Sequence, residues 1–173
     1  MHATSTLFES LRLGPQPEGE EATGSRRTSV IDKSTVNPVK ELEEAFSGVE
    51  LIGLDAEGVD LSRKGRITLL QLSTPTQCFL VDVLGSERDD PVVTWLRTLL
   101  EDDGVLKIIH DCRMDSDALE HLLGISLVNV HDTSCWHAAL GYADKNLNAT
   151  LAYHGLPQND ARDGSVHRTR LAR

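Results

Sequence analysis

Two acidic residues two positions apart, Asp55 and Glu57, are the first in this sequence that could do chemistry. They lie in a largely apolar stretch, Glu50–Glu57, that is typical of a β-strand. Because alternate side chains of a strand share a face, both carboxylates would point the same way, with Cα atoms roughly 6–7 Å apart. Carboxylates at that spacing can converge on two metal ions about 3.5–4 Å apart, the arrangement of two-metal phosphoryl chemistry. The pair is also consistent with an acidic end to a strand before the turn at Gly58.

A second acidic cluster follows the short apolar segment Val105–His110. Asp111, Asp115 and Asp117 come next, where a strand is expected to pass into a helix. Open α/β sheets place their sites at strand ends, and the first turn of a helix favours negative charge. Asp115 is therefore a candidate partner for the first pair of acids, whereas at least one of the other two is expected only to cap the helix.

The charge balance argues against a nonspecific nucleic-acid binder. Over 173 residues, 17 Lys and Arg stand against 27 Asp and Glu, a net charge of −10, and nonspecific affinity depends on neutralising phosphates. Divalent ions bound to the carboxylates would offset this charge locally. Arg63, Lys64 and Arg66 form a dense basic group just after Glu57. They are candidate phosphate contacts, with a solvated hairpin as the alternative.

The remaining reactive and aromatic side chains give weaker indications. His110 is expected to pack or cap at the end of its strand, and His131 and His137 are too loosely spaced for a zinc site. Trp95 and Trp136 lie at helical positions typical of a core, so we interpret both as packing residues rather than as platforms for nucleobases.

Cysteine usage and hydropathy indicate the compartment. Three widely spaced cysteines, without a CxxC pair or a secretory leader, predict reduced thiols in an intracellular protein. The cytoplasm and the nucleus are both compatible, and the mitochondrion is left open. No apolar run approaches 18 residues, so no membrane association is expected.

The elements that position these residues alternate along the chain. Strands are predicted at 50–57, 66–73, 77–83, 105–110 and 126–131, and helices at 38–46, 91–101, 114–123, 134–141 and 146–154. Three antiparallel strands followed by alternating helices and strands predict an α/β fold, a mixed sheet with helices on both faces. Residues 1–33 are interpreted as a flexible leader, 34–159 as the folded domain and 160–173 as an irregular basic tail.

Four segments together resemble one family. Leu54–Gly58 with Gly65–Leu72, Lys107–Asp115 and Asn129–Thr133 are similar to motifs of the DEDD superfamily of 3′-5′ exonucleases, in its RNase D-like branch. The tetrapeptide His-Asp-Cys-Arg within them is most similar to the Egalitarian-like relatives. Some of those relatives are RNA-binding proteins whose active sites have decayed. The likeness covers roughly residues 36–155 and implies a ribonuclease H-like fold.

The resemblance also implies an activity and its residues. Asp55, Glu57 and Asp115 correspond to the family's metal-binding acids, which hold two Mg²⁺ or Mn²⁺ ions and hydrolyse phosphodiesters from a 3′ end. The implied partner is single-stranded RNA or DNA with a 3′ end. The sequence encodes no contact to the 2′-hydroxyl that would choose between the two.

The chain departs from the family at the third motif. That motif is a later helix carrying Tyr-x-x-x-Asp, and neither Tyr142 nor Tyr153 is followed by Asp at the required spacing. We therefore expect a C-terminally truncated domain, without a matching fourth carboxylate or general base. One alternative is a catalytically impaired relative that binds RNA or a protein partner. Another is an incomplete gene product whose exposed sheet face needs a partner chain.

Overall fold

A six-stranded mixed sheet forms the centre of the protein, in a computed structural model that describes residues 27–144 and 146–158. Its strands are β1 (Arg27–Ile31), β2 (Leu51–Val59), β3 (Arg66–Ser73), β4 (Gln77–Asp82), β5 (Leu106–Ile109) and β6 (Val130–Asp132). The helices are α2 (Pro38–Phe46), α3 (Pro91–Leu100), α4 (Arg113–Ala118), α5 (Thr133–Ala139) and α6 (Leu147–Tyr153), and a π-helical turn, η1 (Leu119–Leu123), continues α4.

The strand order is β1-β4-β3-β2-β5-β6. β2, β3 and β4 form an antiparallel meander, and β5 and β6 then add in parallel beside β2. This confirms the predicted mixed sheet of three antiparallel strands followed by parallel ones.

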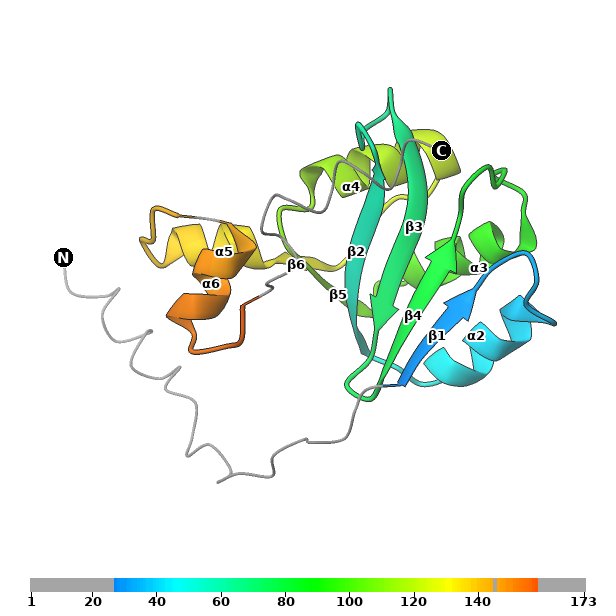
Figure 1. Ribbon diagram of the computed structural model, residues 1–173, viewed down its shortest axis with the longest axis horizontal. Coiled ribbons are helices and arrows are strands. Elements are labelled where there is room, and N and C mark those ends of the chain that lie inside the picture. The colour runs from blue at the N-terminus through cyan, green and yellow to red at the C-terminus, as the bar shows by residue number, and fades with distance from the viewer. Residues whose placement is uncertain (1–26, 145, 159–173) are drawn as a thin grey trace.

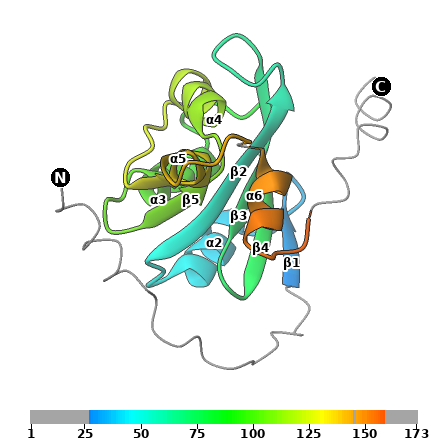
Figure 2. The same cartoon turned by 90° about the vertical axis from the view of Figure 1, so that its left-hand side faces the viewer.

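One face of the sheet carries the hydrophobic core. Ile52, Leu54 and Ala56 alternate along β2 and are buried beneath α2 and α3, which contribute residues such as Phe46 and Leu96. Figures 1 and 2 show α2 and α3 on this side of the strands and α6 on the other. The described helices therefore cover the second face only in part, and the odd-numbered residues of β2 lie on it. No helix in the described part of the chain is long and apolar enough to cross a membrane.

β1 corrects one end of the predicted leader. Residues 27–31 pair in parallel with 77–81 of β4 and form an edge strand instead of irregular chain. The sequence of this strand, Arg-Thr-Ser-Val-Ile, lacks the alternating apolar pattern that marks a longer strand, and only Ile31 is buried. Residues 1–26 and the predicted tail lie outside the described residues.

Three further elements differ in detail from the expectation. Pro38 begins α2 as predicted. Asn37 before it is of a residue type that favours the N-cap position, but it adopts a left-handed conformation with φ 56° and its side chain makes no capping bond. The predicted helix 114–123 changes from α to π geometry at Leu119. β6 begins at Val130 rather than at residue 126, because Asn129 has φ 50° and interrupts the extended backbone.

Candidate active site

Asp55 and Glu57 lie on the open face of β2, as the alternation predicts. Both are half-buried, and both line a groove between the sheet and helices α5 and α6. Gln71 stands directly across from Asp55 on β3, and its Nε2 donates to Asp55 Oδ2 at 3.2 Å. The hairpin register therefore supplies a polar partner that holds the Asp55 carboxylate.

Asp115 reaches β2 from α4 and is only 7% exposed. β5 pairs with β2 only as far as Gly53, so the next part of this edge of β2 is not covered by a strand. There the Asp115 carboxylate accepts a hydrogen bond from the backbone N–H of Ala56, between the two β2 acids. Burial, and next the negative charge of Asp55, raise the pKa of Asp115 to about 6. The structure thus brings Asp115 and Asp55 close enough to repel each other.

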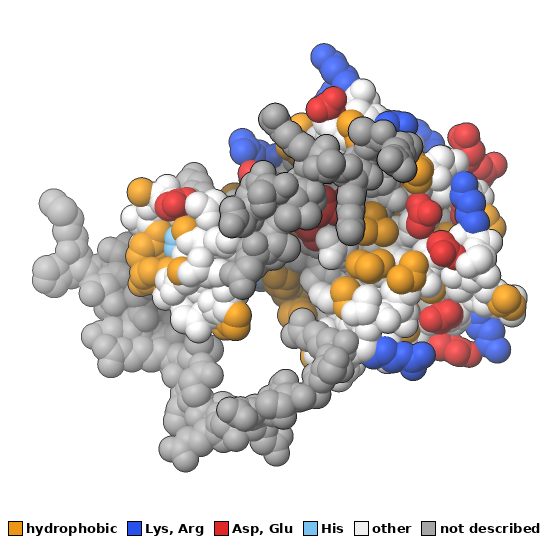
Figure 3. Space-filling model, viewed as in Figure 1, with side chains coloured by type: hydrophobic (Ala, Val, Ile, Leu, Met, Phe, Trp, Pro, Cys, Tyr) orange, Lys and Arg blue, Asp and Glu red, His pale blue; other side chains and the backbone are white. Residues whose placement is uncertain are grey.

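The groove has a volume of about 920 Å³ and is largely apolar. Figure 3 shows hydrophobic side chains on both sides of the hollow that separates the α5–α6 region from the sheet. Asp55 and Glu57 are the acids among its described lining residues. Within the described residues, no three His, Cys, Asp or Glu side chains are grouped tightly enough to hold a metal ion. The assignment of metal ligands therefore stays a prediction.

Carboxylate oxygens are the donors that Mg²⁺ and Mn²⁺ prefer, so the chemistry of this donor set fits such ions. The fit rests on Asp55 and Asp115, whose mutual repulsion a cation would relieve.

His110 directly follows β5 and also lines the groove. Its Nδ1 lies 2.8 Å from Thr133 Oγ1, which donates in turn to the Ile109 carbonyl at 3.2 Å. Because the threonine has a single proton, Nδ1 of His110 is the donor in this pair. The ring is therefore held in a defined orientation just after β5, which is compatible with the packing or capping role expected from the sequence.

Asp132 joins the two helices on either side of the site. Its carboxylate accepts backbone N–H bonds from Asp111 and Cys112 at 3.0 Å and from Ser134 at 2.8 Å. The last bond makes Asp132 the N-cap of α5. Burial opposes the charge of Asp132, but the hydrogen bonds from Ser134, Cys112 and Asp111 outweigh it and lower the pKa well below its usual range.

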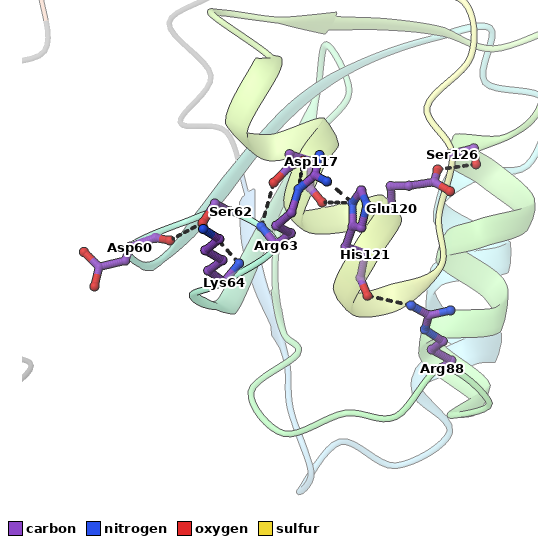
Figure 4. Close-up of polar contacts among 9 residues, drawn as sticks. All are labelled: Asp60, Ser62, Arg63, Lys64, Arg88, Asp117, Glu120, His121 and Ser126. Carbon is purple, nitrogen blue, oxygen red and sulfur yellow. Dashed lines mark hydrogen bonds and ion pairs between the residues drawn. The ribbon is translucent and has the colours of Figure 1, made fainter.

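The basic group on the β2–β3 hairpin is divided between two roles. Arg63 donates to Asp117 through Nε at 2.8 Å and through its backbone N–H at 2.7 Å, which ties the hairpin to α4 (Figure 4). Lys64 and Arg66 are exposed, and no ion pair of either side chain is present among the described residues. They remain candidate phosphate contacts, whereas the Arg63 guanidinium is already paired.

The acids next to Asp115 do not cap α4. Asp117 accepts the bonds from Arg63 described above, and Asp111 forms a 3.1 Å ion pair with Arg113. Cys112 donates its thiol to Asp132, and burial together with this bond raises the pKa of Cys112 to about 11. Cys112 is therefore a neutral thiol at pH 7, which argues against a cysteine nucleophile here.

The two tryptophans differ in their environments. Trp95 packs edge-on against Phe46 next to the core, which confirms the packing interpretation for that residue. Trp136 is 59% exposed and lines the groove, so the same interpretation is wrong for it. Its position in α5 follows the helical spacing, but none of the described elements covers the side of α5 on which it lies.

The sequence motifs assign no role to Gln71 or to the Ala56 N–H. Gln71 could have been found from the hairpin register, since it stands opposite Asp55. No side-chain pattern reveals the Ala56 N–H, because it is available only where β5 leaves β2.

The fold and the pair of acids in the groove together define a ribonuclease H-like domain of the RNase D type. The 3′-5′ exonuclease family profile matches residues 33–158, and the chain belongs to this family.

Known proteins similar to the chain fall into the same group. Mouse piRNA biogenesis protein EXD1 is 35% identical over 139 residues, covering 75% of this chain and 22% of that protein. Mouse exosome complex component 10 is 28% identical over 153 residues, covering 87% of the chain and 17% of that protein. Trypanosoma brucei RNase D, solved in complex with RNA U12, superposes with a TM-score of 0.67 at 27% identity, covering 79% of the chain and 50% of that structure. The chain thus spans about a fifth of these curated relatives and half of this solved neighbour.

Proposed function

We propose that this chain carries a metal-dependent 3′-5′ exonuclease activity that shortens single-stranded RNA from its 3′ end. The observation that carries the proposal is the approach of Asp115 on α4 to Asp55 on β2, beside a groove open to solvent. Two acids from distant parts of the chain, one of them buried, repel each other there. A divalent cation would relieve that repulsion. The choice of RNA rests on the RNase D solved with RNA and on the similarity to an exosome component.

In this mechanism Asp55, Glu57 and Asp115 would hold Mg²⁺ or Mn²⁺. The ions would polarise the terminal phosphodiester and activate water. The protein's own groups prepare the site. Gln71 fixes one oxygen of Asp55, and the Ala56 N–H orients Asp115.

The β2–β3 hairpin and the groove would receive the substrate. Lys64 and Arg66 are exposed on the hairpin directly beyond Glu57 and would contact substrate phosphates. The groove itself would receive the end of the strand.

The test follows a 5′-labelled single-stranded RNA, and DNA of the same sequence, as Mn²⁺ or Mg²⁺ is added. We expect stepwise shortening of the RNA that requires metal and falls at least about 100-fold in Asp55→Ala, since even outer-shell losses at metal sites reach that size. Asp89→Ala, which removes an exposed carboxylate far from the groove lining, is the matched control and should leave the rate unchanged.

Two results would redirect the proposal. RNA binding without shortening would identify a catalytically impaired relative that binds nucleic acid, the alternative favoured by the absence of a tight three-acid group among the described residues. Equal shortening by wild type and Asp55→Ala would place the activity outside this site. Preferential shortening of DNA would overturn only the choice of RNA.

A further inference from the structure

Trp136 is the large exposed aromatic side chain of the groove wall formed by α5. It is 59% exposed, and the groove that it lines also holds Asp55 and Glu57. Leu140, four residues later on the same face of the helix, is 49% exposed and lines the groove as well. An apolar face that the described elements leave exposed, next to polar groups, is typical of a surface that contacts a ligand.

The indole is held in place before any ligand arrives. The ring of His131 packs against it with centroids 5.1 Å apart and planes tilted by 39°. Asp132, the residue between His131 and α5, caps the helix and bonds to the backbone of Asp111 and Cys112. A ring supported on one side and exposed elsewhere offers a flat surface at little further cost in conformational entropy.

We propose that Trp136 is a stacking platform for an unpaired base of single-stranded nucleic acid. The inference rests on the function proposed above and extends it to the recognition of substrate. Every nucleobase has a π-face, so stacking on an aromatic ring tolerates any sequence.

The charge of the chain favours this source of affinity. With a net charge of −10, the protein cannot depend on phosphate neutralisation alone to hold a strand. A stacked base would supply binding that does not depend on basic residues. The position of Trp136 also suits this role, because α5 forms one wall of the groove and the opposite wall carries Asp55 and Glu57.

The experiment measures the affinity of the full chain for single-stranded RNA dodecamers in Ca²⁺, by quenching of tryptophan fluorescence and by anisotropy of a 5′ dye. Each RNA of a series lacks the base at one position counted from the 3′ end. The protein variants are Trp136→Leu, Trp136→Phe and the control Leu84→Ala, which removes an exposed apolar side chain away from the groove.

We expect Trp136→Leu to weaken binding of the intact RNA about tenfold, within the range of about 5- to 150-fold for one stacked base. Trp136→Phe should restore most of the affinity, and Leu84→Ala should have no effect. With the base missing at one particular position, wild type and Trp136→Leu should bind equally, which shows that the lost energy belongs to that base. Equal urea midpoints of the variants, followed through Trp95, establish that they are folded.

Three results would overturn the inference: unchanged affinity in Trp136→Leu, a loss that is the same for every RNA of the series, or no binding of RNA by wild type. The last would leave a protein partner as the occupant of this face. These outcomes can be distinguished from the outcomes of the test for exonuclease activity. Shortening of RNA that is insensitive to Trp136 refutes only the platform. Base-dependent coupling at Trp136 without shortening refutes only the nuclease.

Discussion

Replacing Asp115 by Asn is expected to stabilise the metal-free protein at neutral pH while it removes a proposed metal ligand. Asp115 is 7% exposed, lies close to the negative charge of Asp55, and accepts the N–H of Ala56. Asn keeps an oxygen that can accept that hydrogen bond, but it carries no charge to bury. The substitution therefore isolates the electrostatic cost of the site.

The magnitude follows from the pKa of Asp115, which is raised from 3.8 to about 6 by burial and by Asp55. Between about pH 4 and pH 6 the folded protein keeps a proton that the unfolded chain has released. Stability therefore falls as the pH rises through this window and stays lower above it. The difference corresponds to about 3 kcal/mol. Because neighbouring groups relax, we expect Asp115→Asn to gain about 1–3 kcal/mol at pH 8 and almost nothing at pH 4.

The assay is urea unfolding of both proteins in EDTA at several pH values, with Asp89→Asn as an exposed control. The difference between wild type and Asp115→Asn cancels the other titrating groups. Added Mn²⁺ should stabilise wild type more than Asp115→Asn, because the cation relieves the repulsion that Asn lacks. A loss of stability in Asp115→Asn at pH 8, or a difference that does not change with pH, would refute the reasoning.

Three further experiments test contacts that hold the elements around the site. Asp132→Ala should lower the free energy of unfolding by about 2–4 kcal/mol, because three backbone donors lose a charged acceptor. Urea unfolding at pH 7 measures this loss, and a loss below about 0.5 kcal/mol would contradict the capping role. Wild type should also lose this contribution as the pH falls from about 4 towards the lowered pKa of Asp132. Arg97→Ala should lower the free energy of unfolding by about 2 kcal/mol, since the guanidinium donates to three carbonyls around the end of η1. Arg97→Lys keeps the charge but not the planar group, so it should recover only part of the thermal stability. A double-mutant cycle of Arg63→Ala and Asp117→Ala should show a favourable coupling for this salt bridge, whose Asp117 side chain is 18% exposed. A coupling that cannot be distinguished from zero would mean that the pair does not tether the hairpin.

The order and type of the main elements could be predicted because their patterns are local. The alternation of Ile52, Leu54 and Ala56 identifies β2 and assigns Asp55 to the opposite face. The edge strand β1 could not be predicted in this way, since its pairing with β4 depends on a distant partner and buries only Ile31. Sequence patterns thus indicate strands that bury a face, but not short strands held mainly by backbone pairing.

In the candidate site, too, local patterns could be predicted and contacts between distant parts of the chain could not. The motifs predict which acids matter, but the contact of Asp115 with the Ala56 N–H depends on where β5 leaves β2. Arg63 resembles a free phosphate ligand in sequence, yet Asp117, 54 positions away, occupies its guanidinium. The helical spacing of Trp136 predicts a core residue only if another element covers that side of α5, and in the described residues this side faces the groove.

A single carboxylate connects the two helices, α4 and α5, on which the proposals depend. Asp132 accepts from the backbone that leads into α4, which carries Asp115, and from the first turn of α5, which carries Trp136. If the acids hold the metal ions and the indole holds a base, Asp132 sets the distance between the reacting phosphodiester and the stacked nucleotide. Asp132→Asn can keep the bonds to Asp111 and Ser134 but presents an amide donor to the Cys112 N–H, so it should loosen the α4 side selectively. In this variant the RNA affinity should change less than the rate of shortening, because Trp136 stays in place while Asp115 shifts relative to the acids of β2.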